Sequence, residues 1–452
     1  MKIGFLAMSG VRACDAELLE LGLTLPGFVE RSKQVASLPS LGLLLLAGAT
    51  PAGHELRYAE ADREGVEPAW LEACDLVAIS TFTAQVREAY RIADRLRAAG
   101  VQVAMGGLHV SALPEEALEH ADWVVVGEGE NVWPELVRRV ALGERGGLLR
   151  ASDFEPVRIA ELPVPRYDLL EDRAYNRFTL QTTRGCPWRC EFCASTVMLG
   201  EPYRKRPVAQ VMRDLRALRA VRREPFLEFA DDNTFVDPSW GRELCDALRP
   251  EGLHWFTETD LSIADHPALL DAMARSGCRQ VLIGLEATDA AVLGGVERNG
   301  DFKARRVSDQ IDAIRRIQAR GITVNGCFVL GLDGQGPECF DQVADFVERS
   351  GLYEVQITVQ TPFPGTPLYG RLMSEGRVID PERWEVCTLF DVNFLPTDMT
   401  PEALRRGLHD LSRRLYGAEA VARRRERYFR RLRGARRTRA NSSRAPLVRR
   451  RA

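Results

Sequence analysis

The chain has 452 residues, of which 45% are hydrophobic and 28% are charged, and its formal net charge is −3. This length predicts two or three domains, and the composition is that of a soluble globular protein. The longest apolar run, Leu41 to Ala49, is too short to span a bilayer, and Met1 to Met8 indicates a strand and not a signal peptide. Ten cysteines without paired spacing outside one motif exclude a disulfide framework and favour a reducing cytoplasm.

The charge is distributed unevenly, because residues 413–452 hold sixteen arginines against only Glu419 and Glu426. A basic tail of this kind can bind nucleic acid or an anionic membrane surface. Helix breakers follow at residues 441–443 and 446, and few aromatic residues accompany the arginines. We therefore expect a frayed helix end and an Arg-rich, disordered tail over residues 431–452, without a nucleic-acid partner.

Residues 1–150 alternate short apolar strands with helical patterns, which is typical of a doubly wound, Rossmann-like parallel sheet. The expected strands are Lys2–Ala7, His54–Ala59, Asp75–Ser80, Val101–Met105 and Trp123–Val126. The segments Gly106 to His109 and Gly127 to Glu130 follow the fourth and fifth strands. They would therefore lie at the edge where open α/β sheets bind ligands.

A polar, proline-rich linker over residues 151–176 precedes a second run of βα units in residues 177–370. Including a strand that starts at Phe178, this run has six βα steps with glycines at helix ends, which predicts a parallel barrel or a barrel-like sheet. The later strands are expected at Phe226–Ala230, His254–Thr259, Gln280–Leu285, Ile322–Leu330 and Glu354–Gln360. Residues 371–430 are expected to form a mostly helical cap.

The last expected barrel strand carries two kinds of side chain in alternation. Gln356, Thr358 and Gln360 face one way, and apolar residues face the other. In a barrel covered by helices the polar set points into the interior, where amides and a hydroxyl suit a substrate with hydrogen-bonding groups. The alternative is an ordinary exposed edge strand.

Three cysteines, Cys186, Cys190 and Cys193, follow the first barrel strand at a Cx3Cx2C spacing. One tight loop can then supply three soft thiolates to an iron–sulfur cube and leave the fourth iron open to a chelating ligand. A zinc knuckle would need a fourth Cys or His at comparable spacing, and no histidine lies near the loop. A chance cluster of buried cysteines is the other alternative.

With the aromatic Phe192 immediately before the third cysteine, this motif resembles that of the radical S-adenosylmethionine (SAM) enzymes, whose partial (β/α)6 barrel also matches the six βα steps. The resemblance implies that the three cysteines hold a [4Fe–4S] cluster, that SAM binds the open iron, and that Phe192 packs by the adenine. A low-potential electron donor of the flavodoxin or ferredoxin type would reduce the cluster. SAM would then be cleaved to a 5′-deoxyadenosyl radical that takes hydrogen from a substrate.

Other SAM contacts are implied by the resemblance alone. Glu286 matches a position that contacts the ribose or the amino acid part of SAM, and Asn325 with Gly326 resembles the segment that passes under the adenine. The Gly-Gly-Glu segment that usually holds the methionine amine is replaced here by an alanine followed by Asp231 and Asp232. One of these two aspartates is expected to hold the amine instead.

The segments Leu38–Leu46, Gly106–Ser111 and Gly127–Glu130 resemble the cobalamin (B12)-binding domain that precedes many radical SAM cores. The Asp-x-His-x-x-Gly motif that supplies an axial histidine in one large group of cobalamin proteins is absent after the first strand. Cobalamin would then bind without a protein imidazole, or the domain has kept its fold and lost the cofactor. We expect His109 either to approach the corrin or to form a hydrogen bond within its own loop.

Together these features predict a cytoplasmic radical SAM enzyme that acts on a small molecule, and that methylates carbon if cobalamin is bound. Without cobalamin, the same radical would drive a cyclisation, a rearrangement or a carbon–carbon coupling of a tetrapyrrole, isoprenoid lipid or secondary metabolite. A non-catalytic iron–sulfur protein and a nucleic-acid-binding module are alternatives of another class. A transfer-RNA methylthiotransferase would carry a further cysteine-rich domain and a carboxyl-terminal β-barrel, and neither pattern is present.

Overall fold

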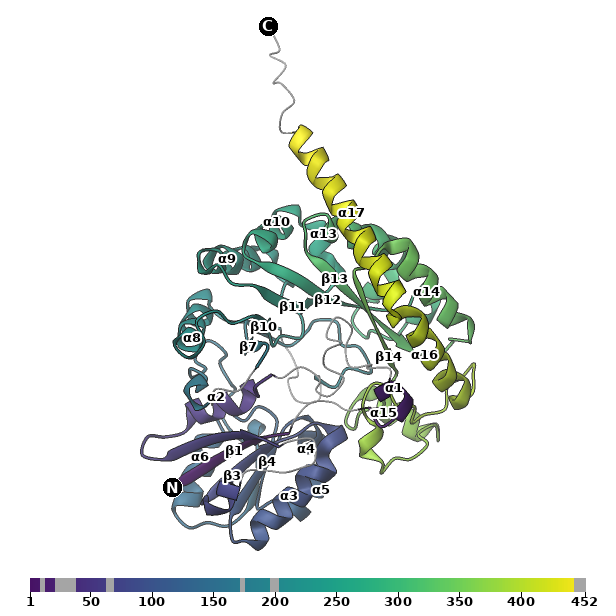
Figure 1. Cartoon of the computed structure of the whole chain (residues 1–452). Coiled ribbons are helices and arrows are strands. Elements are labelled where there is room, and N and C mark those ends of the chain that lie inside the picture. The colour runs from purple at the N-terminus through teal and green to yellow at the C-terminus, as the bar shows by residue number, and fades with distance from the viewer. Residues whose placement is uncertain (9–12, 21–37, 62–68, 171–174, 196–202, 443–452) are drawn as a thin grey trace.

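Two six-stranded parallel sheets form the framework of the computed structural model (Figure 1). The structure describes residues 1–8, 13–20, 38–61, 69–170, 175–195 and 203–442. The first sheet is built from the amino-terminal third of the chain and the second from its middle, as the two runs of βα units predict. The fold class predicted from the sequence is confirmed.

The first sheet has the strand order β2-β1-β3-β4-β5-β6. Its strands are β1 (Lys2–Ala7), β2 (Glu55–Glu60), β3 (Leu76–Ser80), β4 (Gln102–Gly106), β5 (Trp123–Val126) and β6 (Gly147–Arg150). Five of them match the predicted strands within a residue or two. The sixth was not predicted, because only two apolar residues mark it. The strand order reverses between β1 and β3, and this switch point opens a crevice beyond the carboxyl ends of the strands.

Helices cover both faces of this sheet because successive strand residues point to opposite sides. On one side, Phe5 packs against Trp133 with ring centroids 5.5 Å apart. On the other side, its neighbour Leu6 joins a second core together with Val86 and Ile92. The first side carries α2 (Leu41–Ala49) and α6 (Trp133–Ala141), and the second carries α3 (Val86–Ala98), α4 (Leu108–Ala112) and α5 (Pro114–His120).

The second sheet has the order β14-β13-β12-β11-β10-β7, so each strand pairs with its neighbour in the chain. The strands are β7 (Phe178–Leu180), β10 (Leu227–Phe229), β11 (Trp255–Thr259), β12 (Cys278–Glu286), β13 (Thr323–Leu330) and β14 (Glu354–Val359). The outer helices are α8 (Val208–Val221), α9 (Pro238–Leu248), α10 (Pro267–Arg275), α13 (Gln310–Gln318) and α14 (Glu338–Ser350). This is the predicted open (β/α)6 barrel. A short antiparallel pair, β8 (Thr183–Arg184) and β9 (Arg204–Lys205), stands beside it.

The carboxyl-terminal region departs from two expectations. After α15 (Pro367–Ser374), residues 375–400 are irregular apart from one short turn of helix, so the predicted cap is helical only from α16 (Pro401–Tyr416) onward. The helix α17 (Ala418–Ser442) includes residues 431–442, which were expected to be disordered. Arginine, alanine and leucine favour helix, and Gly434 is the only glycine or proline in that stretch. Residues 443–452 lie outside the described part of the chain.

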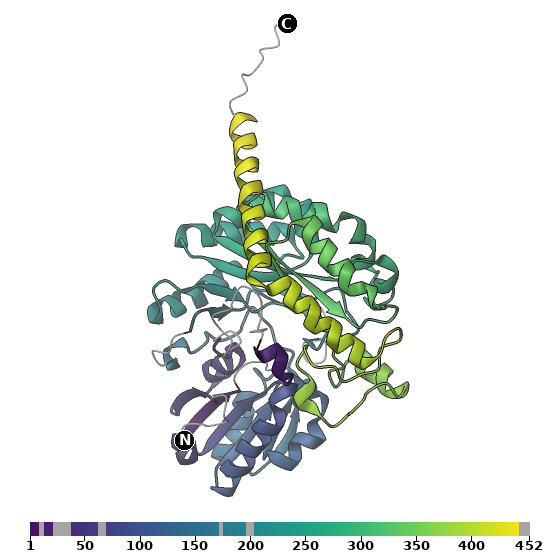
Figure 2. The ribbon, with the colours of Figure 1, turned by 45° about the vertical axis from the view of Figure 1, so that its right-hand side comes forward.

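Both ribbon views show α17 crossing the outside of the barrel and extending away from it (Figure 2). The residues of α17 are on average strongly polar. None of the helices in the described ranges has the length and apolar character needed to cross a membrane.

Candidate active site between the two sheets

The cysteine loop directly follows β8 and has little regular structure of its own. Two of its residues, Gly185 and Arg189, adopt left-handed backbone conformations with φ of 83° and 52°. The backbone N–H of Cys193 donates to the carbonyl of Cys190 at 3.0 Å, which closes the turn that carries two of the thiols. The loop is therefore tight enough to bring its three cysteines to one side.

A segment between β12 and α12 (Phe302–Arg306) holds this loop from outside. The N–H of Glu191 donates to the carbonyl of Val296 at 2.9 Å, and the amide of Asn299 donates to the carbonyl of Pro187 at 2.7 Å. The indole of Trp188 stacks on Phe302 with ring centroids 4.2 Å apart. These contacts fix the loop at its start, middle and end.

Electrostatic effects between the thiols agree with their being close together. Burial raises the pKa of Cys186 to about 11, and the thiol of Cys193 raises it further; burial raises the pKa of Cys190 to about 12, to which Cys193 and Cys186 also contribute. The amide of Asn233 donates to the sulfur of Cys186 at 3.9 Å. Within the described ranges no three His, Cys, Asp or Glu side chains form a group suited to a single metal ion. In a cubane cluster, by contrast, each thiolate binds a different iron. The soft, clustered donor set fits such a cluster.

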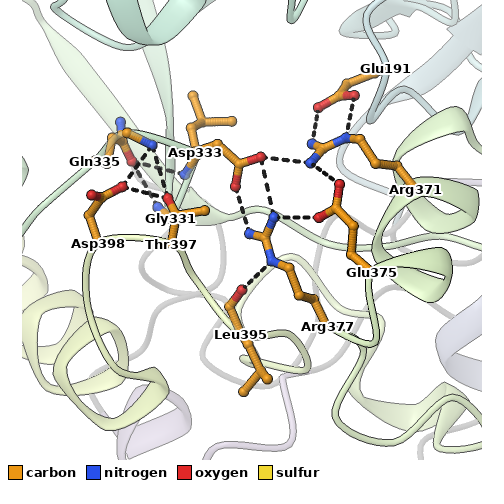
Figure 3. Close-up of polar contacts among 12 residues, drawn as sticks. Glu191, Gly331, Asp333, Gln335, Arg371, Glu375, Arg377, Leu395, Thr397 and Asp398 are labelled. Carbon is orange, nitrogen blue, oxygen red and sulfur yellow. Dashed lines mark hydrogen bonds and ion pairs between the residues drawn. The ribbon is translucent and has the colours of Figure 1, made fainter.

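A network of ion pairs ties the loop to the carboxyl-terminal region (Figure 3). Arg371 of α15 binds the carboxylate of Glu191 at 2.7 Å and that of Asp333 at 2.7 Å. Arg377 approaches the other oxygen of Asp333 at 2.6 Å and also pairs with Glu375 at 2.8 Å. The acidic residue between two of the cysteines is thus linked to the end of β13 and to the irregular segment after α15.

The two aspartates after β10 have different surroundings. Asp231 is buried and accepts hydrogen bonds from the backbone N–H groups of Thr182 and Thr183, at 2.8 and 2.9 Å, and from the hydroxyls of Thr182 and Thr234. Asp232 is only half-buried, and one of its oxygens accepts from the N–H of Gly185 at 3.0 Å. Asp231 therefore stabilises the strand end, whereas Asp232 keeps binding capacity beside the first cysteine.

Glu286 ends β12 with a left-handed φ of 62° and forms an ion pair with Lys303 of α12. Burial opposes the charge on Lys303, but the carboxylate of Glu286 and the nearby Cys190 raise its pKa overall. Gly284 has no side chain and so leaves room for this pair, because a Cβ atom there would collide with both partners. A buried ion pair thus lies at the end of this strand, close to the cysteine loop.

The other predicted SAM contacts lie as follows. Asn325 is 2% exposed and faces the inside of the barrel, and its Oδ1 has no hydrogen-bond donor within the described residues. The missing Cβ of Gly326 points the opposite way, where it would meet Leu285 and Leu352 at 2.9 Å. Gly326 thus faces the apolar core on the outer side of the sheet, not the barrel interior. Phe192 is half-buried and packs against the main core.

Glu258 of β11 also faces the inside of the barrel. Solvent reaches its side chain, yet the surrounding protein and the carboxylates of Glu228, Asp232 and Asp231 raise its pKa to about 8. Glu228 in turn is paired with the buried Arg177 at 2.5 Å. The barrel interior is therefore rich in acidic side chains near its first strands.

A cavity of about 280 Å³ lies between the two sheets. Most of its wall is apolar and comes from α2 and from the carboxyl ends of β3, β4 and β5. Five glycines, Gly42, Gly106, Gly107, Gly127 and Gly129, line it, and the region of the second sheet contributes Gln181, Arg184 and Ala230. Gly107 has a φ of 114°, and a Cβ there would lie 3.0 Å from the carbonyl of Thr81. A flat or bulky ligand can therefore approach the backbone at this edge.

At the rim of the cavity, Arg184 joins the two sheets. It precedes the first cysteine by two residues, is 4% exposed, and binds Glu128 and Glu130 of the loop after β5 at 2.6 Å each. Arg204 also binds Glu128 at 2.6 Å. Burial disfavours the charge on Glu128, but Arg204 and Arg184 lower its pKa overall. This interdomain clamp, Arg184 with Arg204, Glu128 and Glu130, fixes the cysteine loop relative to the cavity.

His109 does not line the cavity. It is fully buried in α4, and its Nε2 lies 3.2 Å from Glu116, while Trp384 packs against its ring edge at 5.1 Å. The indole of Trp384 donates to the same Glu116 at 3.2 Å. His109 thus forms a hydrogen bond with the neighbouring helix α5, and not within its own loop.

Sequence reasoning did not identify Arg184, Lys303 or the partners of Glu191. A usable signal existed for Arg184. The sequence places an arginine two residues before the first cysteine and an acidic Gly-Glu-Gly-Glu segment after an expected strand end, and these opposite charges could have been predicted to pair. For Lys303 and Arg371 no local pattern was available, since each meets its partner only through the fold.

We predict that Arg184→Ala lowers the free energy of unfolding by about 3–5 kcal/mol, because it leaves a buried Glu130 without a cation. Chemical denaturation followed by circular dichroism would measure the change. Arg138→Ala, which removes only an exposed ion pair with Glu135, is the control and should cause no measurable loss. Equal effects of the two substitutions would contradict the role of the clamp.

We also predict a pH dependence from Glu258. Its pKa is raised from 4.5 to about 8 in the folded chain, so the folded state binds this proton more tightly than the unfolded state. The resulting stabilisation is complete below pH 4.5 and is lost as the pH rises through 8. Glu258→Gln, which stays neutral, should therefore gain stability relative to the parent over this range, in unfolding measured at several pH values. Glu224→Gln on the surface should show no such trend.

Comparison with known proteins agrees with this geometry. A model of the radical SAM superfamily matches residues 180–347, and a model of the B12 binding domain matches residues 33–137. A domain of unknown function, DUF4070, matches residues 366–452. The B12-binding match covers most of the first sheet, the radical SAM match covers most of the barrel, and the third match covers the carboxyl-terminal helices.

Similar proteins include several methyltransferases. An uncharacterized methyltransferase from Synechocystis sp. is 30% identical over 369 residues, which cover 80% of this chain and 67% of that protein. Bacteriochlorophyllide d C-12(1)-methyltransferase from Chlorobaculum tepidum is 26% identical over 389 residues, 85% of this chain and 84% of that protein. Hopanoid C-2 methylase from Rhodopseudomonas palustris is 26% identical over 404 residues, 86% and 73% of the two chains.

Two solved structures share the fold over most of this chain. The cobalamin-dependent SAM radical enzyme OxsB, with aqua-cobalamin bound, has a TM-score of 0.66 at 15% identity, covering 90% of this chain and 66% of that one. The radical SAM methyltransferase TsrM from Kitasatospora setae, with cobalamin and a [4Fe–4S] cluster bound, has a TM-score of 0.62 at 16% identity, covering 96% and 99%. The chain belongs to the radical SAM superfamily, among the enzymes with an amino-terminal B12-binding domain, whose cofactors are a [4Fe–4S] cluster, SAM and cobalamin.

Proposed function

We propose that this protein is a cobalamin-dependent C-methyltransferase that acts on a small molecule in the cytoplasm, with a flavodoxin- or ferredoxin-type electron donor. The observation that carries the proposal is the cavity between the two sheets. It is lined by the carboxyl ends of β3, β4 and β5 and by Arg184, which precedes the first cysteine by two residues. A methyl carrier in this cavity would lie next to the site of radical formation.

The residues present fit both cofactors. Cys186, Cys190 and Cys193 would hold the cluster, and the apolar, glycine-lined cavity is large enough for the nucleotide end of a cobalamin. When bound, the cluster supplies the electron for SAM cleavage and cobalamin supplies a transferable methyl group. No histidine lines the cavity within the described residues, so cobalamin would bind without a protein imidazole.

Two residues would seat SAM at the strand ends. Asp232 is the better candidate for the methionine ammonium group, because Asp231 already accepts hydrogen bonds from four donors. Glu286 lies with Lys303 close to Cys190, where a carboxylate and an ammonium group can orient the zwitterionic end of SAM. The third predicted contact, Asn325, pairs with Leu282 and therefore lies deeper in the barrel than these two, where its oxygen has no donor among the described residues.

Each methylation would consume two SAM molecules. One gives up its methyl group and leaves as S-adenosylhomocysteine. The other is cleaved, and its adenosyl part leaves with the substrate hydrogen as 5′-deoxyadenosine. The chain's own contribution is to hold the substrate carbon between the cluster loop and the cavity and to exclude water from the radical.

We predict that Cys186→Ala, Cys190→Ala and Cys193→Ala each abolish cluster binding and reduce 5′-deoxyadenosine formation to background. The measurements are iron and sulfide content and product analysis, using protein purified without oxygen from cells supplied with hydroxocobalamin. Cys74→Ala, in the first domain, is the control and should retain iron and activity. The parent protein should yield both 5′-deoxyadenosine and S-adenosylhomocysteine. Formation of 5′-deoxyadenosine alone, without bound cobalt, would favour a cyclisation or coupling instead.

We predict that Leu46→Trp fills the cavity and weakens cobalamin binding at least about tenfold, which corresponds to ~1.4 kcal/mol. Leu46 is half-buried on α2 and lines the cavity, so a larger side chain can enter it without disturbing the core. Cobalt content after loading and gel filtration measures the effect, and the iron content should not change. Leu142→Trp, at a side chain 67% exposed, is the matched control. Full cobalt retention by Leu46→Trp would show that cobalamin binds elsewhere.

A further inference from the structure

Strand register brings four side chains of the barrel interior into one row. Glu258 of β11 pairs with Leu282 of β12, Leu282 pairs with Asn325 of β13, and Asn325 pairs with Glu354 of β14. The next residue, Gly326, points its missing Cβ at side chains beneath the outer helices. Since strand residues alternate, the row faces the concave side of the sheet, away from the helices.

The carboxylate of Glu258 differs from the other acids of this interior. Glu228 is paired with Arg177, Glu286 with Lys303, and Glu354 accepts a hydrogen bond from Gln280 at 2.8 Å. The backbone carbonyl of Glu258 accepts from the N–H of Thr234, but its carboxylate accepts no hydrogen bond from any residue that the structure describes, and solvent reaches it. An ionised carboxylate can only accept, and it gains most from a charged donor.

Buried amides on β13 and β14, two and three strands from Glu258, provide a second, independent observation. The Oδ1 of Asn325, at 2% exposure, and the Oε1 of Gln356, at 8% exposure, have no donor among the described residues. Gln356 lies one row nearer the strand ends, because it pairs with Cys327 of β13. Leaving buried acceptors unmatched costs free energy, so a ligand that carries several N–H groups would satisfy this wall.

The wall lies deeper in the barrel than the strand ends. Leu282, the partner of Glu258, precedes Glu286 by four residues, which is about 13 Å along a strand. Glu286 and the cysteine loop mark the region proposed for the amino acid part of SAM. The carboxylate of Asp232 is close enough to act on Glu258, so a ligand bound at Glu258 would extend from the SAM site past Asp232 into the barrel.

We propose that the substrate of this enzyme carries an amine or guanidinium cation that binds Glu258, and further N–H groups that donate to Asn325 and Gln356, two and three strands away. The inference rests on the proposed function and specifies its substrate class. The raised pKa of Glu258 supports it, because a cation would relieve the repulsion from the neighbouring carboxylates. A purely hydrocarbon substrate would leave all three polar groups unmatched.

The test uses the complete protein loaded with cluster and cobalamin, and SAM with a deuterated methyl group. Metabolite extract from the source organism is divided on a cation exchanger at pH 7 into a bound pool and an unbound pool. We expect the label to enter a compound of the bound pool, and this pool to stimulate 5′-deoxyadenosine formation. Glu258→Gln, which keeps the shape but removes the charge, should reduce both effects at least tenfold. The surface variant Glu224→Gln should reduce neither.

The other outcomes separate the two proposals. Labelling of a compound in the unbound pool, or equal labelling by the parent and Glu258→Gln, would overturn the cation site and leave methyl transfer standing. Stimulation of 5′-deoxyadenosine by the bound pool that depends on Glu258, without transferred label, would support the cation site and refute methyl transfer. If Glu258→Gln also lost SAM cleavage in the absence of extract, Glu258 would serve SAM, and the inference would be wrong. If neither pool caused labelling or stimulation, both proposals would fail.

Discussion

The cysteine loop has almost no secondary structure of its own, so the positions of its thiols depend on charged contacts from distant parts of the chain. Arg184 holds the start of the loop to the first domain, and Arg371 holds Glu191, between the second and third cysteines, to the carboxyl-terminal region. Both interactions are partly or fully buried. Such pairs add little net stability compared with apolar packing, but removing one partner is costly because a buried charge is left unmatched. They therefore favour one arrangement of the loop over its alternatives.

The two arginines act through different physical surroundings. Arg184 lies at the rim of an apolar cavity, where the low local dielectric strengthens its attraction to Glu128 and Glu130. Arg371 lies in a more accessible network with Asp333 and Glu375, where its geometry matters more than its Coulomb energy. One interaction fixes the loop relative to the first sheet, and the other connects it to the helices that follow the barrel.

Much of the framework could be predicted because periodicity and turn residues are local signals. The alternation of strands with helical patterns in residues 1–150 predicted both β1 at Lys2–Ala7 and a sheet covered by helices on both faces. The polar residues on β14 indicated the side of that strand that faces the barrel interior. The cysteine spacing marked the candidate site in the same way. Local patterns could not show that Asp231 is already satisfied by Thr182, Thr183 and Thr234, or that Gly326 faces the core outside the barrel. Those facts depend on which strands become neighbours.

The wrong expectations have related causes. Residues 375–400 contain apolar residues at helical intervals, but Trp384 and Phe394 are buried against two different cores, so the segment follows an irregular path between them. In α17 the breakers at residues 441–443 and 446 suggested disorder from residue 431, whereas the intrinsic helix preference of arginine and alanine continues the helix to Ser442.

The cavity between the sheets has a thermodynamic consequence beyond catalysis. Its wall is assembled from two domains, so a molecule bound there contacts both of them at once. Any ligand that binds only the assembled state stabilises that state by mass action, in proportion to the logarithm of its free concentration over its dissociation constant. The supply of such a ligand would therefore set the fraction of molecules in which the two domains are assembled. A cell that lacks the ligand would hold more molecules with separated domains, which are more easily degraded.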